Sequence, residues 1–430
     1  MTESELIESR NSEDPYGLHL RSERPEKLLV VNSGSSSLKY SFFDTESEAN
    51  AAHGVVERIG AGGTRLVQRG PKGELSRELP QGGHREAFAA MVRELSASDT
   101  GVLRDPSEIS VVGHRVVHGG ERFAQAVVVD DEVLRAIEAL GPLAPLHNPV
   151  NAAGIREARR VFPAVPHVAV FDTAFHQTLP PHAYLYGLPY SYYEQKGVRR
   201  YGFHGTSHSY VSLAAAQHLG RHHAALSIVS CHLGNGASLC AVKQGQSIDT
   251  SMGMTPGEGL IMGTRCGDID PGVLLHLERA LGLGVAQLDE LLNEHSGLLG
   301  LSGISSDMRE IEAAAEAGER RALLALQAFS YRVRKYIGAY VAALGGLDVL
   351  IFTGGIGQGS ATVRSLATQG LGCMGIDLDA RRNLEARGFG EICRISTDAS
   401  PATVLVVPTH EEQMIARESL RAIARSHRFR

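Results

Sequence analysis

The sequence predicts an α/β protein built from two domains. Its 430 residues are too many for one ordinary hydrophobic core, and 43% of them are hydrophobic, as in a globular protein. Two segments about 200 residues apart share the order of apolar strand, Gly/Ser/Asn turn and second strand, which suggests that two halves follow one plan. A third strand runs into glycines and then a helix, which is typical of a parallel sheet.

The first segment predicts a β-hairpin with a polar turn. Residues 28–31 form a short apolar run, and apolar residues at 38, 40 and 42 alternate with polar ones in the period of a second strand. The turn between them can present backbone N–H groups and hydroxyls to one anion. It lacks the G-x-x-x-x-G-K-[ST] pattern of a phosphate loop that opens a helix, and an ordinary polar hairpin remains the alternative.

The second segment, residues 226–243, predicts another hairpin. Asn235-Gly236 favours a two-residue type I′ turn, because both central residues of that turn need positive φ. With such a turn, Cys231 and Cys240 would lie opposite each other on the two strands. Two hairpins of this kind, one in each half, could hold a polyphosphate from opposite sides.

Residues 347–352 predict a strand of a parallel sheet, followed by the glycine-rich segment TGGIGQG at 353–359 and a helix that opens near Ser360. Glycines at such a junction let a ligand approach the backbone, and the helix N-terminus favours negative charge. The spacing does not match G-x-G-x-x-G, which disfavours a dinucleotide fold.

Two further stretches predict secondary structure without chemistry. Residues 64–110 predict surface strands, loops and a helix. Residues 320–344 predict a helix whose apolar stripe belongs to the core, namely Leu323, Leu326, Val333, Ile337, Tyr340 and Leu344.

Composition excludes several function classes. The net charge of -6 argues against nucleic acid as a partner. Five cysteines without a C-x-x-C pair indicate reduced thiols in the cytoplasm, with neither a disulfide framework nor a zinc site. No apolar stretch approaches the ~20 residues of a membrane span. Residues 1–25 are polar and charged, and we expect a flexible extension without a secretory signal.

Seven polar motifs, in this order along the chain, resemble the acetate kinase family within the superfamily of acetate and sugar kinases, chaperones and actin. They are VNSGSSSLK (31–39), GHRVVHGG (113–120), FDTAFHQT (171–178), YGFHGTSH (201–208), HLGNGAS (232–238), GTRCGD (263–268) and SGLLGLSG (296–303). The resemblance implies two actin-like (ribonuclease H-like) domains with duplicated βββαβαβα cores and a cleft between them. One domain would hold residues 26–174 with 413–430, and the nucleotide-binding domain residues 175–412.

The resemblance also implies the reaction. It is a reversible, direct, in-line transfer of the ATP γ-phosphoryl group to acetate, giving acetyl phosphate and ADP, in a cytoplasmic homodimer. The metal would be Mg²⁺, with Mn²⁺ as a substitute. The alternatives are a propionate or butyrate kinase, a kinase that uses pyrophosphate, or, in another class, an ATP-gated protein like actin or a chaperone.

Phosphoryl transfer needs cations and hydrogen-bond donors around the charged equatorial oxygens. Arg115 and Arg265 offer planar forks suited to phosphate and carboxylate, and the resemblance places both at the transferring group. It makes His204 a donor to the same group and gives His147 a substrate-side or supporting role. A carboxylate acceptor is already ionised at neutral pH, so Asp172 is not needed as a base and would hold the metal or position Arg115.

The resemblance assigns the remaining site residues by motif. Asn32 and Glu411 join Asp172 at the metal, and an apolar pocket for the acyl group comprises Val117, Leu146, Phe203 and Pro256. The phosphate and nucleotide contacts are Ser35, Ser37, Lys39, His232, Gly234, Asn235, Gly236, Gly354, Gly355, Ile356 and Gly357. For His114, His118, His176 and His208 we expect structural roles.

Three positions depart from the family pattern. The usual GGIGEN is GGIGQG at 354–359, the usual PTNEE or PTDEE is PTHEE with His410, and Cys266 replaces serine or threonine beside Arg265. The change at 354–359 bears on the preference for ATP over other phosphoryl donors, and His410 bears on the metal site. The third suggests sensitivity to thiol reagents.

Overall fold

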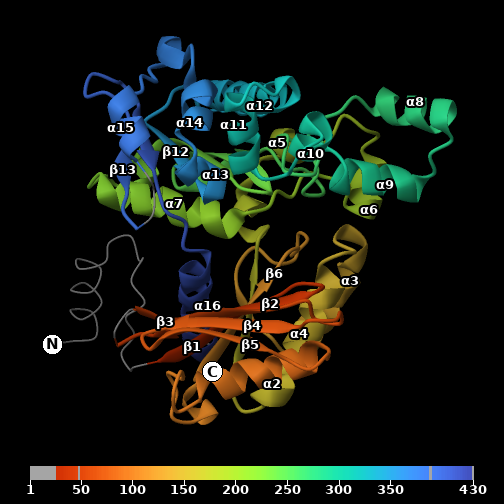
Figure 1. The fold of residues 1–430 in the computed structure, drawn as a ribbon, viewed down its shortest axis with the longest axis vertical. Helices are drawn as coiled ribbons and strands as arrows, with labels where there is room; N and C mark the ends of the chain where they lie inside the picture. Colours follow the sequence, from red (N-terminus) through yellow and green to blue (C-terminus); the bar gives the residue numbers. More distant parts are fainter. Residues whose placement is uncertain (1–25, 47–48, 387–389, 429–430) are drawn as a thin grey trace. The chain divides into compact units, whose positions relative to one another are not determined.

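The computed structural model describes residues 26–46, 49–386 and 390–428, so the predicted extension at residues 1–25 lies outside the described part. The chain forms two compact units (Figure 1). Unit 1 runs to Ala174 and resumes at His410, and unit 2 spans Phe175–Thr409.

Unit 1 contains an eight-stranded sheet in the order β5-β4-β3-β2-β1-β6-β8-β7. Its strands are β1 (Lys27–Ser33), β2 (Ser37–Asp44), β3 (Ala49–Glu57), β4 (Arg65–Gly70), β5 (Gly73–Glu78), β6 (Val111–Val116), β7 (Val127–Val128) and β8 (His167–Phe171). Its helices are α2 (His84–Leu95), η1 (Pro106–Glu108), α3 (Asp131–Ala139), η2 (Gly141–Leu143), α4 (Asn148–Val161) and α16 (Glu411–Arg428). The first three strands form an antiparallel meander, whereas β1, β6 and β8 run parallel.

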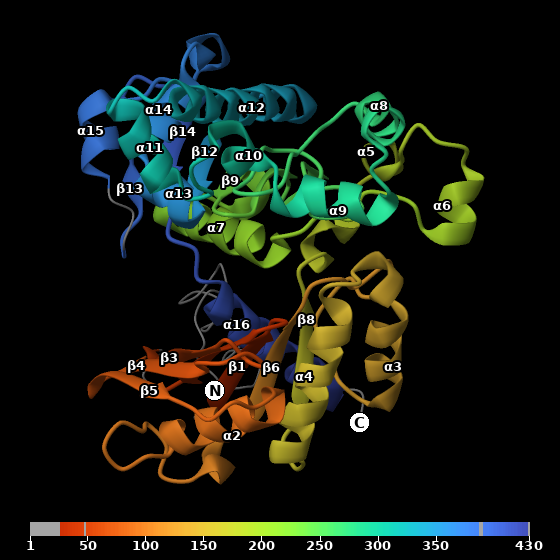
Figure 2. The same ribbon diagram turned by 45° about the vertical axis from the view of Figure 1, so that its right-hand side comes forward.

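Strand β1 lies in the middle of this sheet and is buried on both faces. Leu29 and Val31 pack in one cluster with residues of α2 and α4. Leu28 and Val30 point to the other face and pack with residues of α16, as the two-residue period of a strand requires. Helix α16 therefore returns from the C-terminal end of the chain to cover the first sheet (Figure 2).

Unit 2 contains a six-stranded sheet in the order β11-β10-β9-β12-β14-β13. Its strands are β9 (Ser227–Leu233), β10 (Ala237–Lys243), β11 (Gln246–Thr250), β12 (Val349–Thr353), β13 (Cys393–Arg394) and β14 (Thr403–Val406). Strands β9 to β11 form an antiparallel meander, and β9, β12 and β14 run parallel. The order β11-β10-β9-β12-β14 repeats β3-β2-β1-β6-β8 of unit 1, so the predicted common plan of two halves is confirmed.

The remaining elements surround this second sheet. They are η3 (Ala174–Thr178) at the boundary of the units, α5 (Pro181–Tyr184), α6 (Ser191–Lys196), α7 (Gly205–His218), η4 (His223–Ala225), α8 (Pro271–Leu281), α9 (Val285–Glu294), α10 (Gly297–Ser302), α11 (Met308–Glu316), α12 (Arg320–Leu344), α13 (Gly354–Gly359), α14 (Ala361–Thr368), η5 (Leu371–Met374) and α15 (Ala380–Glu385). Figures 1 and 2 show α7 and α12 on opposite faces of the β9–β12 sheet. The predicted helix at 320–344 is confirmed as α12, but Leu323 is 44% exposed and does not belong to its buried stripe.

Two predictions about turns were wrong. Leu233 pairs with Ala237, so three residues connect β9 to β10, and neither Asn235 nor Gly236 has positive φ. The connection is therefore not a two-residue type I′ turn. The longer turn changes the register, so Cys231 faces Leu239 instead of Cys240, and both thiols are free.

The glycines after β12 also differ from the prediction. They form helix α13 themselves, beginning at Gly354 with φ of 77°, before α14 opens at the predicted place with the Ser360 hydroxyl capping its first turn. A Cβ at Gly354 would lie 2.6 Å from the Leu233 carbonyl oxygen, so this start requires glycine. Among the described residues, no helix is long and apolar enough to cross a membrane.

Candidate active site

In unit 1, Arg115 and Asp172 form a bidentate ion pair at the carboxyl ends of two parallel strands. Arg115 is near the end of β6 and Asp172 directly follows β8, its neighbour in the sheet. The Arg115 Nε and Nη2 atoms donate to the two carboxylate oxygens at 3.0 and 2.5 Å. The Asp172 N–H donates to the Val116 carbonyl at 3.0 Å, which fixes the carboxylate against β6. Because Asp172 is only 2% exposed, it holds the guanidinium in one orientation.

Glu411, the first residue of α16, belongs to the same cluster. The pKa of its carboxyl is raised to about 7, chiefly because the group is buried. The positive charges of Arg115 and Lys39 oppose this shift. The carboxylates of Asp172 and Glu412 add to it. Glu411 is therefore a buried carboxyl group close to the negative charge of Asp172, and the positive charges nearby do not offset its burial.

The excess of negative charge fits a divalent cation. Mg²⁺ uses one or two carboxylates together with water and substrate phosphates, and Asp172 and Glu411 are such a pair. Within residues 26–46, 49–386 and 390–428, no group of three or more His, Cys, Asp or Glu side chains is arranged to hold a metal ion. A metal in unit 1 would therefore depend on few protein ligands and on the substrate.

The first hairpin brings Asn32 and Lys39 together. They face each other across β1 and β2, so their side chains emerge on the same face of the sheet. In the turn, the Gly34 N–H donates to the Ser37 carbonyl at 2.8 Å, and Ser35 is exposed. Lys39 is exposed and contributes to the electrostatics of Glu411, which links the hairpin to the Arg115 cluster.

Two asparagines at the start of α4 hold the strand end that carries Val117. The Asn151 side chain accepts from the Val117 N–H at 3.1 Å and donates to the Ser33 carbonyl at 2.9 Å. The Asn148 side chain exchanges two hydrogen bonds with the backbone of His118. Neither asparagine was predicted from the sequence, because an asparagine that binds backbone groups leaves no pattern in polarity or spacing.

The other predicted residues of unit 1 differ in exposure. Val117 is buried at 7% exposure, whereas Leu146 is 67% exposed. His147 is half-buried at the N-cap of α4.

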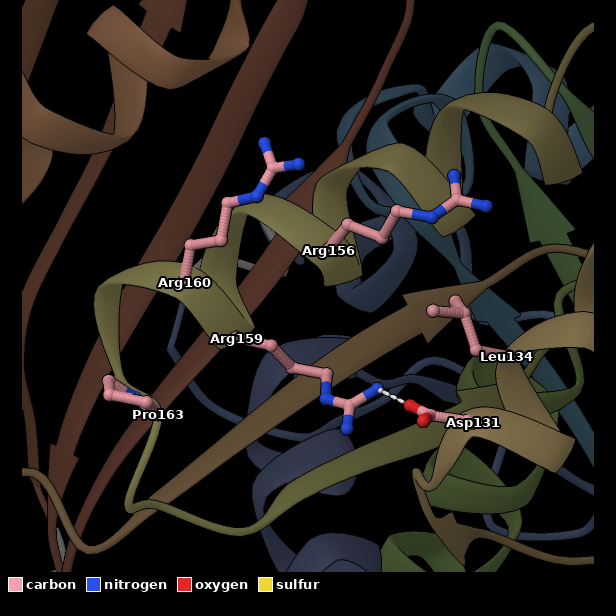
Figure 3. Close-up of a pocket in the computed structure, with 6 residues that line it drawn as sticks. All are labelled: Asp131, Leu134, Arg156, Arg159, Arg160 and Pro163. Carbon is pink, nitrogen blue, oxygen red and sulfur yellow. Dashed lines mark hydrogen bonds and ion pairs between the residues drawn. The ribbon is translucent and has the colours of Figure 1, made fainter.

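A separate hollow in unit 1 lies along α4, shown in Figure 3. Its lining consists of Asp131, Leu134, Arg156, Arg159, Arg160 and Pro163 and includes none of the predicted site residues. Each arginine already pairs with a carboxylate: Arg159 with Asp131 at 2.8 Å, Arg156 with Glu138 and Arg160 with Glu157. The hollow is therefore a poor site for an added anion.

In unit 2, His204 is the N-cap residue of α7 and has φ of 55°, in the left-handed region. A non-glycine residue in this region costs about 1–3 kcal/mol and persists only where the surroundings fix it, which is common at functional sites. Its ring stacks on His232 with centroids 4.3 Å apart. Its Nδ1 atom is 2.9 Å from the Ser238 hydroxyl, and its Nε2 atom lies 3.4 Å from the Cβ position of Gly236 in the second hairpin.

Arg265 lies beside the same hairpin. Its Nη1 atom is 3.6 Å from the Cβ position of Gly236 and donates to the Pro256 carbonyl at 3.4 Å. Burial lowers the pKa of its guanidinium, and in the part of the chain that the structure describes no carboxylate pairs with it. A half-buried arginine without a carboxylate partner is a ready anion site. Unit 2 thus brings His204, His232 and Arg265 together around Gly236.

The hairpin and the Arg265 loop are joined directly. The Gly263 N–H donates to the Asn235 carbonyl at 2.9 Å. A Cβ at Gly263 would lie 1.8 Å from the Asn235 side-chain oxygen, so a larger residue there would displace the Asn235 side chain. Asn235 itself is exposed, and Phe203 is buried next to His204.

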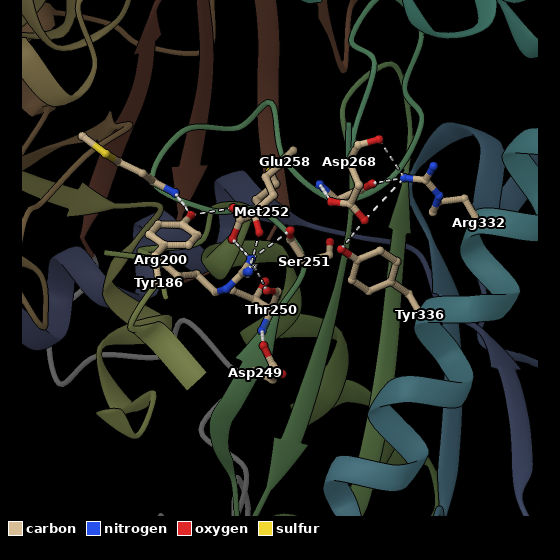
Figure 4. A network of polar contacts seen from close by, with 12 residues as sticks. Tyr186, Arg200, Asp249, Thr250, Ser251, Met252, Glu258, Asp268, Arg332 and Tyr336 are labelled. Atoms are coloured by element: carbon tan, nitrogen blue, oxygen red, sulfur yellow. Dashed lines mark hydrogen bonds and ion pairs between the residues drawn. The ribbon is translucent and has the colours of Figure 1, made fainter. Parts of the chain in front are cut away.

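A polar network anchors the loop that carries Pro256 and Arg265 (Figure 4). Arg200 donates to the carbonyls of residues 250, 251 and 252 at 3.0–3.1 Å and pairs with Glu258. Further along the loop, Asp268 accepts from the Tyr336 hydroxyl at 2.9 Å and pairs with Arg332 at 3.4 Å. Sequence reasoning missed this network because its members are far apart in the chain.

Helix α13 presents the predicted glycines. Gly355 is exposed with open space at its Cβ position, whereas Gly357 is buried. The carbonyls of Gly357 and Gln358 accept from Arg364 Nη1 at 2.9 and 2.7 Å. Arg364 is fully buried, and this burial lowers the pKa of its guanidinium to about 10. It fixes the end of the glycine helix and was also missed.

The four histidines with expected structural roles are all buried and hydrogen-bonded. His114 contacts His167 at 3.0 Å, and the N–H of Gly120 donates to His118 at 2.9 Å. His176 contacts the Ser247 hydroxyl at 2.8 Å, and His208 contacts two serines. Burial lowers the pKa of each, so they are neutral parts of the core.

Two of the departures from the family pattern have defined surroundings. The His410 carbonyl accepts from the Met414 N–H at 3.0 Å at the start of α16, and the His410 side chain is exposed. The Cys266 thiol donates to the Gly267 carbonyl at 3.1 Å, and burial raises the pKa of the thiol. A raised pKa lowers the thiolate fraction, which speaks against unusual reactivity of Cys266.

The duplicated sheet and the anion-binding groups define a two-domain phosphotransferase with actin-like halves. Residues 27–417 match the Acetokinase family, and the chain belongs to that family. It is 52% identical over 393 residues to an acetate kinase of Clostridium botulinum, covering 91% of this chain and 98% of that protein.

Two solved structures have the same fold. The crystal structure of Porphyromonas gingivalis acetate kinase has a TM-score of 0.89 and 46% identity, covering 93% of this chain and all of that one. A propionate kinase from Francisella tularensis has a TM-score of 0.86 and 38% identity, covering 92% of this chain and 99% of that one.

Proposed function

We propose that this chain is an acetate kinase, a phosphotransferase that moves the γ-phosphoryl group of ATP directly to acetate and forms acetyl phosphate and ADP. The reaction is reversible because an acyl phosphate is itself a strong phosphoryl donor. The observation that carries the proposal is Arg265, a half-buried cation without a described carboxylate partner, set beside His204 at a glycine hairpin. This arrangement supports binding of a transferring phosphoryl group.

In the proposed mechanism, Arg115 and Arg265 bind the oxygens of the transferring group and stabilise their growing charge. His204 donates a hydrogen bond to the same group. Asp172 orients Arg115, as their two short hydrogen bonds support. No general base is required, because acetate is ionised at neutral pH and attacks in line through its own oxygen. His147 supports the acceptor side.

The divalent metal, Mg²⁺ or Mn²⁺, would be held by Asn32, Asp172 and Glu411, directly or through water. When bound, it neutralises the phosphate oxygens of ATP. The raised pKa of Glu411 supports this assignment, since a cation would relieve the crowding of its carboxylate by Asp172.

The nucleotide contacts are assigned to both hairpins and to the glycine helix. Ser35, Ser37 and Lys39 would contact phosphate from the first hairpin. From the second hairpin we assign His232, Gly234, Asn235 and Gly236, and from α13 we assign Gly354, Gly355, Ile356 and Gly357. The open space at the Cβ position of Gly355 supports a close approach of the nucleotide to the backbone.

The acceptor pocket is assigned to Val117, Leu146, Phe203 and Pro256. The proposal of acetate over propionate is supported by the identity to the acetate kinases of Clostridium botulinum and Porphyromonas gingivalis, 52% and 46%, against 38% for the Francisella propionate kinase. One methylene in an apolar pocket changes the free energy of the transition state by about 1–3 kcal/mol, so propionate should react more slowly and still react.

We also propose a homodimer in the cytoplasm. Helix α8 buries none of its residues in the protomer, and its Val273, Leu275 and Leu281 are 38%, 51% and 65% exposed. Contiguous exposed apolar side chains support an interface with a second copy. All five cysteines are free thiols, which supports a reducing compartment.

The test is the dependence of ADP formation on the acceptor. Purified protein with Mg-ATP should form ADP only when a short-chain carboxylate is present. Slow ADP formation at a rate that does not depend on the carboxylate would instead favour an ATP-gated protein of the actin or chaperone type.

A further inference from the structure

Four side chains of unit 2 form a continuous hydrogen-bonded chain that ends at His204. Ser230 Oγ in β9 lies 2.7 Å from His208 Nδ1 in α7. His208 Nε2 lies 2.8 Å from Ser238 Oγ in β10, and Ser238 Oγ lies 2.9 Å from His204 Nδ1. Three of the four are completely buried, so water does not substitute for any of these contacts.

His208 requires one of its two serine partners to donate a hydrogen bond and the other to accept one. Burial holds the pKa of His208 well below its usual value, and the neighbouring His176 and His232 lower it further, so its ring is neutral. A neutral imidazole has one N–H donor and one acceptor nitrogen. One serine must therefore donate to His208, and the other must accept from it.

Ser230 determines the direction in which the hydrogen bonds of this chain are donated. Among the described residues, its hydroxyl has a single hydrogen-bond partner, His208 Nδ1. If Nδ1 carried the proton, the Ser230 hydroxyl proton would be buried without an acceptor, which is costly. Ser230 therefore donates to Nδ1, and His208 Nε2–H donates to Ser238. The Ser238 hydroxyl proton is then free to donate to His204 Nδ1.

We propose that His208 and Ser238 are positioning residues that keep the proton of neutral His204 on Nε2. The Nε2–H then faces the glycine hairpin beside Arg265, where it donates to the phosphoryl group without the ring having to be protonated. The proposal rests on the proposed function. The titratable or charged groups that face His204 in unit 2 include His208 from α7, His232 from β9 and Arg265 from its loop.

The direct test is the protonation state of the His204 ring nitrogens, measured at pH 8 by a two-bond ¹H–¹⁵N correlation spectrum of the full chain. The His204→Gln variant assigns the signals. We expect Nδ1 to be unprotonated and Nε2 to carry the proton. A protonated Nδ1 with a bare Nε2 would overturn the proposal, whether or not the protein proves to be a kinase.

Kinetics give a second test. Ser238→Ala should lower kcat roughly 10- to 100-fold, with the KM values for acetate and ATP within about twofold, as for other residues that orient a reacting group. Its kcat should also fall more steeply with rising pH than that of the wild type, because without the Ser238 hydroxyl the neutral ring of His204 no longer holds its proton on Nε2. Ser238→Thr keeps the hydroxyl and should restore most of the activity.

The matched control is Ser212→Ala. Ser212 is also a buried serine that contacts a histidine, His223, at 3.1 Å in the same unit, and it belongs to no predicted motif. Its loss should leave kcat and the pH profile unchanged. A Ser238→Ala enzyme with the kcat and pH profile of the wild type would refute the positioning role. Absence of acyl phosphate from the wild type would refute the proposed function, while the spectrum would still test the proton position.

Discussion

Three buried histidines should make the folded protein less stable as the pH falls from 8 to 5. Burial lowers the pKa values of His118, His167 and His176 to about 4 in the folded protein. In the unfolded chain, each histidine titrates near ~6.5. Between these pH values the unfolded chain binds more protons than the folded protein, so the free energy of unfolding decreases with falling pH.

The size of the effect follows from the two pKa values. From pH 8 to pH 5, each of the three histidines should lower the free energy of unfolding by about 2 kcal/mol, or about 6 kcal/mol together. Glu411 works in the opposite direction, because its pKa of about 7 lets the folded protein take up a proton first. Protonation of Glu411 raises the free energy of unfolding by about 2–3 kcal/mol over the same range. The net decrease from these four groups is therefore about 3–4 kcal/mol. Buried His114 and His208 act in the same direction as the other three histidines.

The assay is urea unfolding at several pH values, with the free energy summed over all transitions because the chain has two units. The His167→Gln variant should lose the contribution of His167 to this decrease, about 2 kcal/mol. Between pH 8 and pH 9 these histidines are neutral in both states and contribute no slope. A free energy of unfolding that is constant, or that rises, from pH 8 to pH 5 would show that the buried histidines do not dominate its pH dependence.

Three further predictions concern activity. Arg265→Ala should lower kcat about 10³-fold without changing the circular dichroism spectrum, because it removes a cation from the phosphoryl group; a loss below tenfold would contradict that role. Glu258→Gln should lower both the melting temperature and kcat, because Arg200 loses its carboxylate partner and the loop that carries Arg265 is held less firmly. A lower melting temperature with unchanged kcat would show that this network does not support catalysis. Val117→Ala should raise the propionate-to-acetate ratio of kcat/KM about tenfold, and an unchanged ratio would remove Val117 from the pocket.

The sequence was sufficient for some strands, since β1, β2, β9 and β12 each appear as a short apolar or alternating run. It failed at the turn after β9, where Asn235-Gly236 favours positive φ but the connection is one residue longer than assumed. Local preference does not determine the register there, because the turn is also tied to Gly263 from a distant loop.

For the candidate site, the grouping of several charged residues could be predicted and the residues that hold them in place could not. Arg115, Asp172 and Glu411 do form one cluster, and His204 and Arg265 do share the Gly236 hairpin. Supporting residues such as Asn151, Arg200 and Ser238 act through hydrogen bonds between distant segments. Such contacts form between residues that are far apart in the chain. They produce no periodic pattern of residue types in a single sequence.

The most direct test of the central claim is formation of acyl phosphate, trapped with hydroxylamine, from Mg-ATP and acetate, propionate or butyrate. Strong product is expected with acetate, less with propionate and little with butyrate. Absence of acyl phosphate with every acid, from protein that still binds ATP, would contradict the proposed kinase activity.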